Sequence, residues 1–130
     1  MCLFVDKTIH STHTPIRVER DLKVYKVLSI MDDGFITPYQ ATIVNFVDGK
    51  CVLTAHCFDN ELRYLANNSY QQCINNGIHS YRDNIHSVIL KNKNESYRIF
   101  KAIIPKGTLV WFGLFGEICS EKLIIYNEII

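Results

Sequence analysis

The feature that most constrains the fold is a series of short apolar runs, rich in β-branched and aromatic residues, with turn-forming residues between them. The longest runs are LKVYKVLSIM (Leu22 to Met31) and YRIFKAIIP (Tyr97 to Pro105). Val, Ile, Tyr and Phe favour strands, whereas Gly, Pro, Asn and Asp favour turns. Asp-Asp-Gly at 32–34 and Pro-Lys-Gly at 105–107 end the two runs. The pattern therefore predicts two long strands, each followed by a turn.

The rest of the chain continues this pattern. The polar segment Ser11 to Asp21 is expected to be an arm or loop, and FITPYQATIVNFV (35–47) to hold a loop around Pro38 and then a short strand. Asp48-Gly49 is a strong hairpin-turn signal, so KCVLTAHCF (50–58) is expected to be the return strand. The C-terminal segment LVWFGLFGEICSEKLIIYNEII predicts two more strands, with a break near Gly113 to Gly116.

Two segments carry helical patterns. Ser80 with Asp83 three residues later resembles an N-cap with an acidic third position. Apolar residues at helical spacing follow, which predicts a helix from about Tyr81 to Lys91; they are Ile85, Val88 and Ile89. A weaker pattern predicts a second helix between Asn60 and Ile74, with one side formed by Leu62, Leu65, Ala66 and Cys73.

Several strands with short turns and one or two short helices indicate an α+β fold with a mostly antiparallel sheet. A length of 130 residues suits a single domain spanning 1–130. The C-terminal strands are apolar on both faces, so a helix or a second subunit is expected to cover the outer face. We expect a homo-oligomer, a dimer or larger.

Composition narrows the functional class. Apolar residues make up 48% and charged residues 21% of the chain, which indicates an ordered globular protein. A net charge of +1 is too small for a protein that coats long nucleic acid. No signal peptide or membrane-spanning stretch is recognisable. The five cysteines form no CxxC pair, so we expect a cytoplasmic protein whose cysteines are reduced and mostly buried.

The stretch GKCVLTAHCFDN (49–60) resembles the segment around the general-base histidine of trypsin-like proteases, with one alanine missing before His56. The chain is too short for the two barrels of that fold, and its serines lack the glycine context of a nucleophile. We interpret the stretch as a strand with His56, Val52 and Thr54 on one face. The opposite, buried face is expected to hold Cys51, Leu53, Ala55 and Cys57.

Metal and thiol chemistry have weak sequence support. The possible zinc ligands are not closely paired, and we expect no metal site or other cofactor; they are Cys51, His56, Cys57, Cys73 and His79. A reactive pair of Cys57 with His79 stays open, although nothing in their spacing favours it.

Two stretches are candidate binding sites. In GIHSYRDNIHS (77–87), a glycine turn precedes His79, Tyr81 and Arg82. Tyr81 can stack on a planar ring and Arg82 can bind a phosphate through two hydrogen bonds. A capped helix start with an aromatic residue packed beneath it is the structural alternative.

The second stretch is IPKGTLVWFGLFGEICSEKLII (104–125). Its Lys106-Gly107-Thr108 turn can contact an anion, and its aromatic residues can offer a stacking surface. The alternative is that these aromatic residues fill the core or a dimer interface; they are Trp111, Phe112 and Phe115.

An ordered set of short motifs resembles a group of small phage and prophage proteins that includes the Thoeris anti-defence sponges. The set covers most of the chain: an initial Met-Cys, VYKVL (24–28), TPY (37–39), GIHSY (77–81), AIIPKGT (102–108) and GEICSEKLII (116–125). The resemblance implies a small α+β homo-oligomer in the host cytoplasm. It also implies sequestration of a cyclic ADP-ribose-type immune signal, in some members also of cyclic oligonucleotides, without degradation.

The resemblance also implies a set of ligand-binding residues. Tyr81 would be the aromatic contact, with His79 beside it, and Asn92 a polar contact. The basic groups for phosphates would be Lys26, Arg82, Arg98 and Lys106. Leu109 stands where an arginine is expected after the Lys-Gly-Thr motif.

Three functional hypotheses follow. The first is a non-enzymatic binder of a nucleotide-derived signal. The second is a protein-interaction or virion-associated phage protein, because of the apolar C-terminal strands. The third is a nucleotide-processing enzyme in which His79, Tyr81 and Glu117 act.

Overall fold

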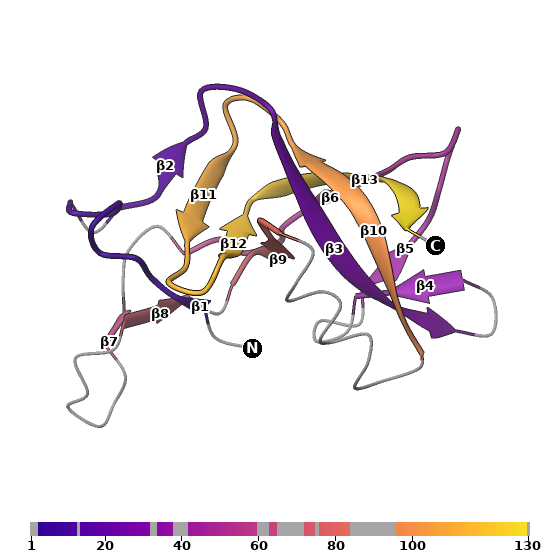
Figure 1. Cartoon of the computed structure of the whole chain (residues 1–130), viewed down its shortest axis with the longest axis horizontal. Coiled ribbons are helices and arrows are strands. Elements are labelled where there is room, and N and C mark those ends of the chain that lie inside the picture. Colours follow the sequence, from indigo (N-terminus) through magenta and orange to yellow (C-terminus); the bar gives the residue numbers. More distant parts are fainter. Residues whose placement is uncertain are drawn as a thin grey trace.

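The computed structural model describes residues 3–12, 14–31, 34–37, 42–59, 63–64, 72–74, 76–83 and 96–129. Every regular element in these ranges is a β-strand (Figure 1). The strands are β1 (Leu3–Phe4), β2 (Ile16–Arg17), β3 (Leu22–Met31), β4 (Gly34–Ile36), β5 (Ile43–Val44), β6 (Cys51–Thr54), β7 (Arg63–Tyr64), β8 (Gln72–Ile74), β9 (Ile78–Tyr81), β10 (Tyr97–Ile104), β11 (Leu109–Phe112), β12 (Glu117–Ser120) and β13 (Lys122–Ile129).

Most strands belong to one antiparallel sheet with the order β2-β11-β12-β9-β3-β10-β13-β6, from which β4 and β5 extend beside β3. A small second sheet has the order β1-β8-β7. The mostly antiparallel sheet expected from the sequence is confirmed.

The two longest strands form the central ladder. β3 and β10 pair continuously, from Ser29 opposite Tyr97 to Leu22 opposite Ile104 (Figure 1). β10 ends just before Pro105, because proline has no N–H group for a ladder hydrogen bond. Both predicted long strands are therefore confirmed, as is the turn after the second one, in which Gly107 has φ 86°.

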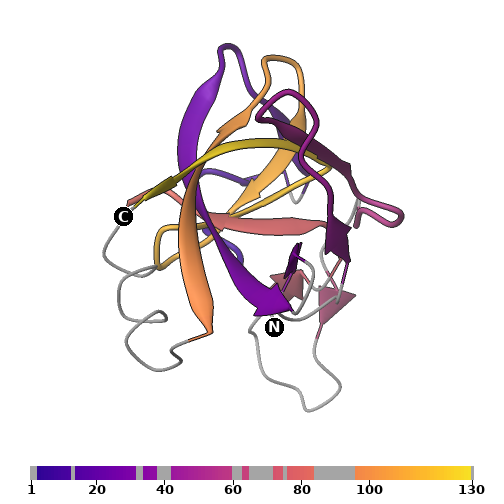
Figure 2. The same cartoon turned by 90° about the vertical axis from the view of Figure 1, so that its right-hand side faces the viewer.

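The sheet curls around one core. Val24 and Leu28 of β3 pack in the same buried cluster as Leu53 of β6 and Val110 of β11. β6 ends the strand order and β11 lies next to its other end, so a flat sheet would hold these residues far apart. Figure 2 shows the strands crossing around this shared interior.

A second apolar cluster lies on the other face of β11 and β12. Trp111 and Cys119 are fully buried there against residues of the N-terminal segment and β8, namely Leu3, Val5 and Ile74. Backbone hydrogen bonds from Asp6 N to Phe112 O (2.9 Å) and from Leu114 N to Phe4 O (2.9 Å) hold the N-terminal segment in place. This segment, and no helix of the described residues, covers that face.

The hairpin turn at Asp48-Gly49 is confirmed. Asp48 has φ 54° and Gly49 has φ 78°, and Val47 pairs with Lys50. Two successive positive φ angles are typical of a type I′ turn. The strand after the turn finds its main partner elsewhere, because β6 pairs with β13 over four residue pairs.

The α part of the predicted fold is wrong for the described residues, none of which is helical. Tyr81, the expected start of a helix, ends strand β9 opposite Glu117, and Arg82 N extends the ladder to Gly116 O (2.8 Å). Ser80 is buried in mid-strand and caps no helix. Residues 84–91 of that predicted helix lie outside the described residues.

The weak helix predicted from Asn60 to Ile74 is also wrong where the structure describes it. Arg63–Tyr64 and Gln72–Ile74 are strands that pair with each other. The rest of this segment, and the loop predicted at Pro38, lie outside the described residues.

Three details of the strand predictions need correction. The C-terminal segment forms three strands, because Glu121 makes a second break between β12 and β13. The polar segment 11–21 contains strand β2. The buried face of the stretch from Cys51 is confirmed for Cys51 and Leu53, but Cys57 is exposed because β6 ends at Thr54.

Candidate functional site

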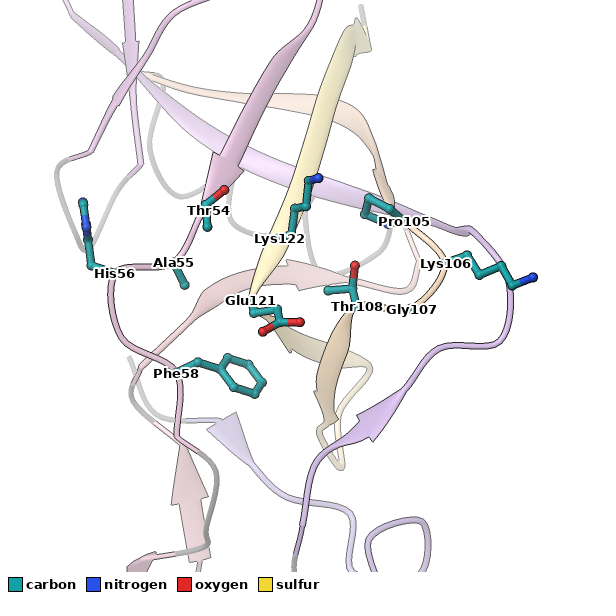
Figure 3. A pocket seen from close by; sticks show the side chains of 10 residues that line it. All are labelled: Thr54, Ala55, His56, Phe58, Pro105, Lys106, Gly107, Thr108, Glu121 and Lys122. Carbon is teal, nitrogen blue, oxygen red and sulfur yellow. The ribbon is translucent and has the colours of Figure 1, made fainter.

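A cavity of about 410 Å³ opens where the end of β6 meets the turn between β10 and β11 and the start of β13 (Figure 3). Its size is in the range of small-molecule sites. The lining residues are Thr54, Ala55, His56, Phe58, Pro105, Lys106, Gly107, Thr108, Glu121 and Lys122.

Three side chains of different chemistry project into this space. Figure 3 shows the Phe58 ring, the Glu121 carboxylate and the Thr108 side chain around it. Two hydrogen bonds with the backbone of Leu109 hold Glu121: Leu109 N donates to its side-chain Oε1 (3.0 Å), and its backbone N donates to Leu109 O (3.1 Å). An aromatic face, a carboxylate and a hydroxyl together suit a ligand with a planar ring and hydroxyl or amino groups.

Lysines lie at the rim of the cavity. The amines of Lys106 and Lys122 point away from its centre (Figure 3). The backbone N–H groups of the turn are already used, since Lys106 N donates to Asp21 Oδ1 (2.8 Å), Gly107 N to Val18 O (2.8 Å) and Thr108 N to Pro105 O (3.1 Å). An anion at this turn would therefore be bound by side chains.

A hydrogen-bonded network fixes the residue that follows Phe58. Asp59 is buried and accepts a hydrogen bond from Asn76 Nδ2 at 2.8 Å. Its carbonyl oxygen accepts one from Trp111 Nε1 at 2.6 Å. These contacts attach Phe58 to the second apolar cluster, so the ring is held in position before any ligand binds.

A smaller cavity of about 240 Å³ also borders the segment after β6 and shares Ala55 and His56 with the first. His56 is exposed and lies beyond the end of β6, so the strand alternation that holds for the buried Cys51 and Leu53 does not extend to it. In Figure 3 the His56 side chain points away from the centre of the larger cavity.

The Tyr81-Arg82 pair is placed differently from the predicted exposed site. Tyr81 is buried in β9, between Tyr25 of β3 and Glu117 of β12. Arg82 is exposed, and its guanidinium carbon lies 4.7 Å from the centre of the Phe112 ring, a cation–π distance.

Lys26 lies inside the protein. Its Nζ donates a 2.6 Å hydrogen bond to the carbonyl oxygen of His79. Burial lowers the pKa of this ammonium group to about 8. The structure thus brings Lys26 and the half-buried His79 together, but away from solvent.

The remaining predicted residues are dispersed. Arg98 is half-buried on β10, with its Nε 3.7 Å from Glu128 Oε1 and its Nη1 donating to Tyr97 O (3.0 Å). Asn92 lies outside the described residues. Of the predicted residues that the structure describes, Lys106 alone lines the larger cavity. Leu109 is half-buried, and its backbone N–H donates a hydrogen bond to the Glu121 carboxylate.

The aromatic residues of the C-terminal segment were expected either to offer a stacking surface or to fill the core or a dimer interface, and the structure shows both buried and exposed ones. Trp111 fills the second apolar cluster and Phe112 packs partly buried against the main core, whereas Phe115 is exposed.

The cysteines and histidines of the described residues form no metal-binding group of three or more ligands. Cys51 and Cys119 are buried free thiols, and burial raises the pKa of both. Cys57 is an exposed free thiol.

Sequence reasoning missed Phe58, Glu121 and Lys122. Glu121 and Lys122 had one usable signal: a charged pair between two apolar runs marks a strand break. Phe58 follows the protease-like stretch, and no local pattern relates it to residues more than sixty positions later.

In the described part of the chain, no helix is long and apolar enough to cross a membrane.

Comparison with known proteins assigns this chain to no family. No protein-family model, curated protein or solved structure matches this chain.

Proposed function

We propose that this protein binds a small, anionic, nucleotide-derived signalling molecule and sequesters it without degrading it. The resemblance to the anti-defence sponges suggests a cyclic ADP-ribose-type ligand, a phage origin and action as a homo-oligomer in the host cytoplasm. The proposal places the ligand in the larger cavity and assigns no chemical step to the protein.

The observation that carries the proposal is the combination of groups at this cavity. The Phe58 ring can stack on a base, while the Glu121 carboxylate can accept hydrogen bonds from ribose hydroxyls. Lys106 and Lys122 at the rim can attract phosphates that stay partly hydrated. A nucleotide-derived ligand carries all three kinds of group.

Isothermal titration calorimetry with cyclic ADP-ribose isomers, ADP-ribose and cyclic dinucleotides tests the proposal. We expect at least one to bind with a Kd of about 1 μM or tighter, as a protein that sequesters a dilute signal requires. Absence of binding heat with every one of these compounds would refute the proposal.

Variants then locate the site. Glu121→Gln is expected to weaken binding about tenfold through loss of a charged acceptor, and Phe58→Leu by about ten- to a hundredfold through loss of stacking. Lys101→Ala is the matched control, because Lys101 is an exposed lysine on β10 that lines neither cavity. If all three variants bind the ligand with the same affinity, the binding site does not lie at the larger cavity.

Recovery of the ligand distinguishes sequestration from catalysis. The protein is incubated with bound ligand for hours, denatured, and the released compound is analysed by mass spectrometry. Intact ligand at full yield is expected, and a product that accumulates with time would instead favour the nucleotide-processing enzyme.

Exposed apolar side chains favour a protein-interaction role as the second candidate. Ile43, Val47 and Val52 are 64%, 71% and 56% exposed around β5 and the edge strand β6. Edge strands with exposed apolar residues readily pair with another chain. Val52→Lys is expected to reduce self-association in analytical ultracentrifugation if this edge forms the homo-oligomer, and unchanged sedimentation would contradict that role.

A further inference from the structure

Three polar side chains lie in a row on the core face of the curled sheet. Val24 and Leu28 belong to the main apolar cluster, so Lys26, midway between them on β3, faces the same interior. Tyr25 pairs with Tyr81, which places Lys26 opposite Ser80 in the antiparallel register.

Ser120 continues this row on the next strand. In the β9–β12 ladder, Ser80 pairs with Ile118 and Ile78 pairs with Ser120. Ile78 and Ile118 both belong to the main apolar cluster, so the two serines share its face. They are diagonal neighbours, close enough for one small group to contact both.

These side chains are almost completely removed from solvent. Lys26 is 7% exposed, and Ser80 and Ser120 are 0% exposed. The hydroxyl groups of both serines have no hydrogen-bond partner among the described residues. Lys26 Nζ carries three N–H donors, of which one is used by the 2.6 Å bond to His79 O.

The charge of Lys26 is also uncompensated within the described part of the chain. Lys26 forms no ion pair with another described residue. Buried charges in proteins are normally paired, and buried polar atoms without protein partners commonly bind water or an ion.

We propose that Lys26, Ser80 and Ser120 form an internal binding site for one small monovalent anion of about the size of chloride. The ammonium group and the two hydroxyls are all hydrogen-bond donors, and the ammonium group also supplies the positive charge. A water molecule would accept hydrogen bonds from these groups but leave the ammonium charge unbalanced in a medium of low dielectric constant. The site shares no residue with the cavity lined by Phe58 and Glu121, and it does not depend on the function proposed there.

Anion-dependent stability tests the site. Thermal unfolding is measured in sodium chloride, sodium bromide and sodium gluconate at neutral pH and equal ionic strength, since gluconate is too large to enter. We expect Tm to be about 4 °C higher in chloride and bromide than in gluconate. Equal Tm values in the three salts would overturn the proposal.

Variants separate this site from general salt effects. Ser80→Ala and Ser120→Ala are each expected to reduce the chloride-dependent rise in Tm by half or more, and Lys26→Met to abolish it. Ser29→Ala is the control, because Ser29 is a half-buried serine on the same strand as Lys26 whose hydroxyl lies 3.5 Å from that of Ser96. A chloride effect of the same size in all four variants would also overturn the proposal.

Crystals of the wild-type protein grown in bromide locate the anion directly. This test does not depend on whether Lys26→Met folds. An anomalous bromide peak is expected within hydrogen-bonding distance of Lys26 Nζ and Ser80 Oγ. Ordered water at that position, without anomalous signal, would refute the anion site.

Discussion

Lys26 donates a 2.6 Å hydrogen bond from its side-chain nitrogen to the backbone carbonyl oxygen of His79. The strands that carry these residues, β3 and β9, are paired at Tyr25 and Tyr81. Lys26 therefore supplies, through its side chain, a partner for a carbonyl group of the neighbouring strand. Burying an ammonium group to make this hydrogen bond lowers the free energy of unfolding, and the size of this loss can be measured.

Stability is expected to rise with pH through the titration of Lys26. Its pKa is about 8 in the folded protein and 10.5 in the unfolded chain, so the unfolded chain binds more protons between these values. The contribution of Lys26 to the free energy of unfolding should therefore increase from about pH 8 to pH 10.5, by up to ~3 kcal/mol. Urea denaturation of the wild type and Lys26→Met in gluconate buffer checks this, and Lys26→Met should lack the increase. The buried thiols of Cys51 and Cys119, whose pKa is raised, act in the opposite direction above about pH 9 in both proteins, so the contribution of Lys26 is the difference between the two pH profiles. Parallel pH profiles of the two proteins would contradict the assignment.

Gly77→Ala is expected to destabilise the protein by about 3 kcal/mol. Gly77 has φ 113°, and an added Cβ would overlap the Cys119 sulfur and crowd the Phe58 ring. Gly49→Ala is the matched control: it also has positive φ, 78°, but nothing lies within 4 Å of its added Cβ. It should cost only about 1 kcal/mol in urea denaturation. The double variant Gly77→Ala/Cys119→Ala should regain part of the loss, and an additive loss would show that the sulfur contact is unimportant.

Acid is expected to loosen the N-terminal segment through His10. Its Nε2 accepts a hydrogen bond from Phe112 N (2.8 Å) while Nδ1 bonds to Thr14 O (3.0 Å), which requires the neutral ring. Burial lowers the pKa of His10 below its usual 6.5, so the unfolded chain takes up the proton first and stability falls as pH drops below about 6.5. Hydrogen exchange at the Phe112 amide, corrected for intrinsic rates, should accelerate between about pH 7 and pH 5. Constant protection over this range would refute the role of His10.

Asn76→Ala is expected to cost about 2 kcal/mol of stability, because it removes the 2.8 Å hydrogen bond to the buried Asp59 carboxylate. It should also weaken ligand binding at the larger cavity, since Asp59 follows Phe58 in the chain. Asn127→Ala, at an exposed position of β13, is the control and should change neither property. Calorimetric titration and urea denaturation of both variants check this, and a loss of stability with unchanged affinity would show that Phe58 does not need this support.

The local sequence was sufficient for strands that carry their own signals. The run from Leu22 to Met31 and the Asp48-Gly49 turn were predicted with correct limits, because β propensity and positive-φ turn chemistry are properties of a few adjacent residues. The Ser80–Asp83 spacing misled for the same reason. A helix cap is a local pattern. In the folded protein Ile78–Tyr81 instead pairs with residues 117–120 as a strand, and these partners are distant in the sequence.

The candidate site was not predictable in this way. Phe58, Thr108 and Glu121 come from three separate segments, and only the pairing of β13 with both β6 and β10 brings those segments to one cavity. Their spacing in the chain has no periodicity that a local pattern could reveal.

The sequence by itself determined that this chain forms an antiparallel sheet, where its long strands run and where its tight turns fall, because these depend on neighbouring residues. The buried side of β6 was predictable from its alternation, whereas only the tertiary structure decided that the side of β3 with Lys26 is inside. Lys26 occupies a strand position that is as compatible with solvent as with a core, and the curling of the sheet over β6 and β11 encloses it. Burial depends on contacts between residues far apart in the sequence, so Lys26 became buried only when the sheet closed around the core.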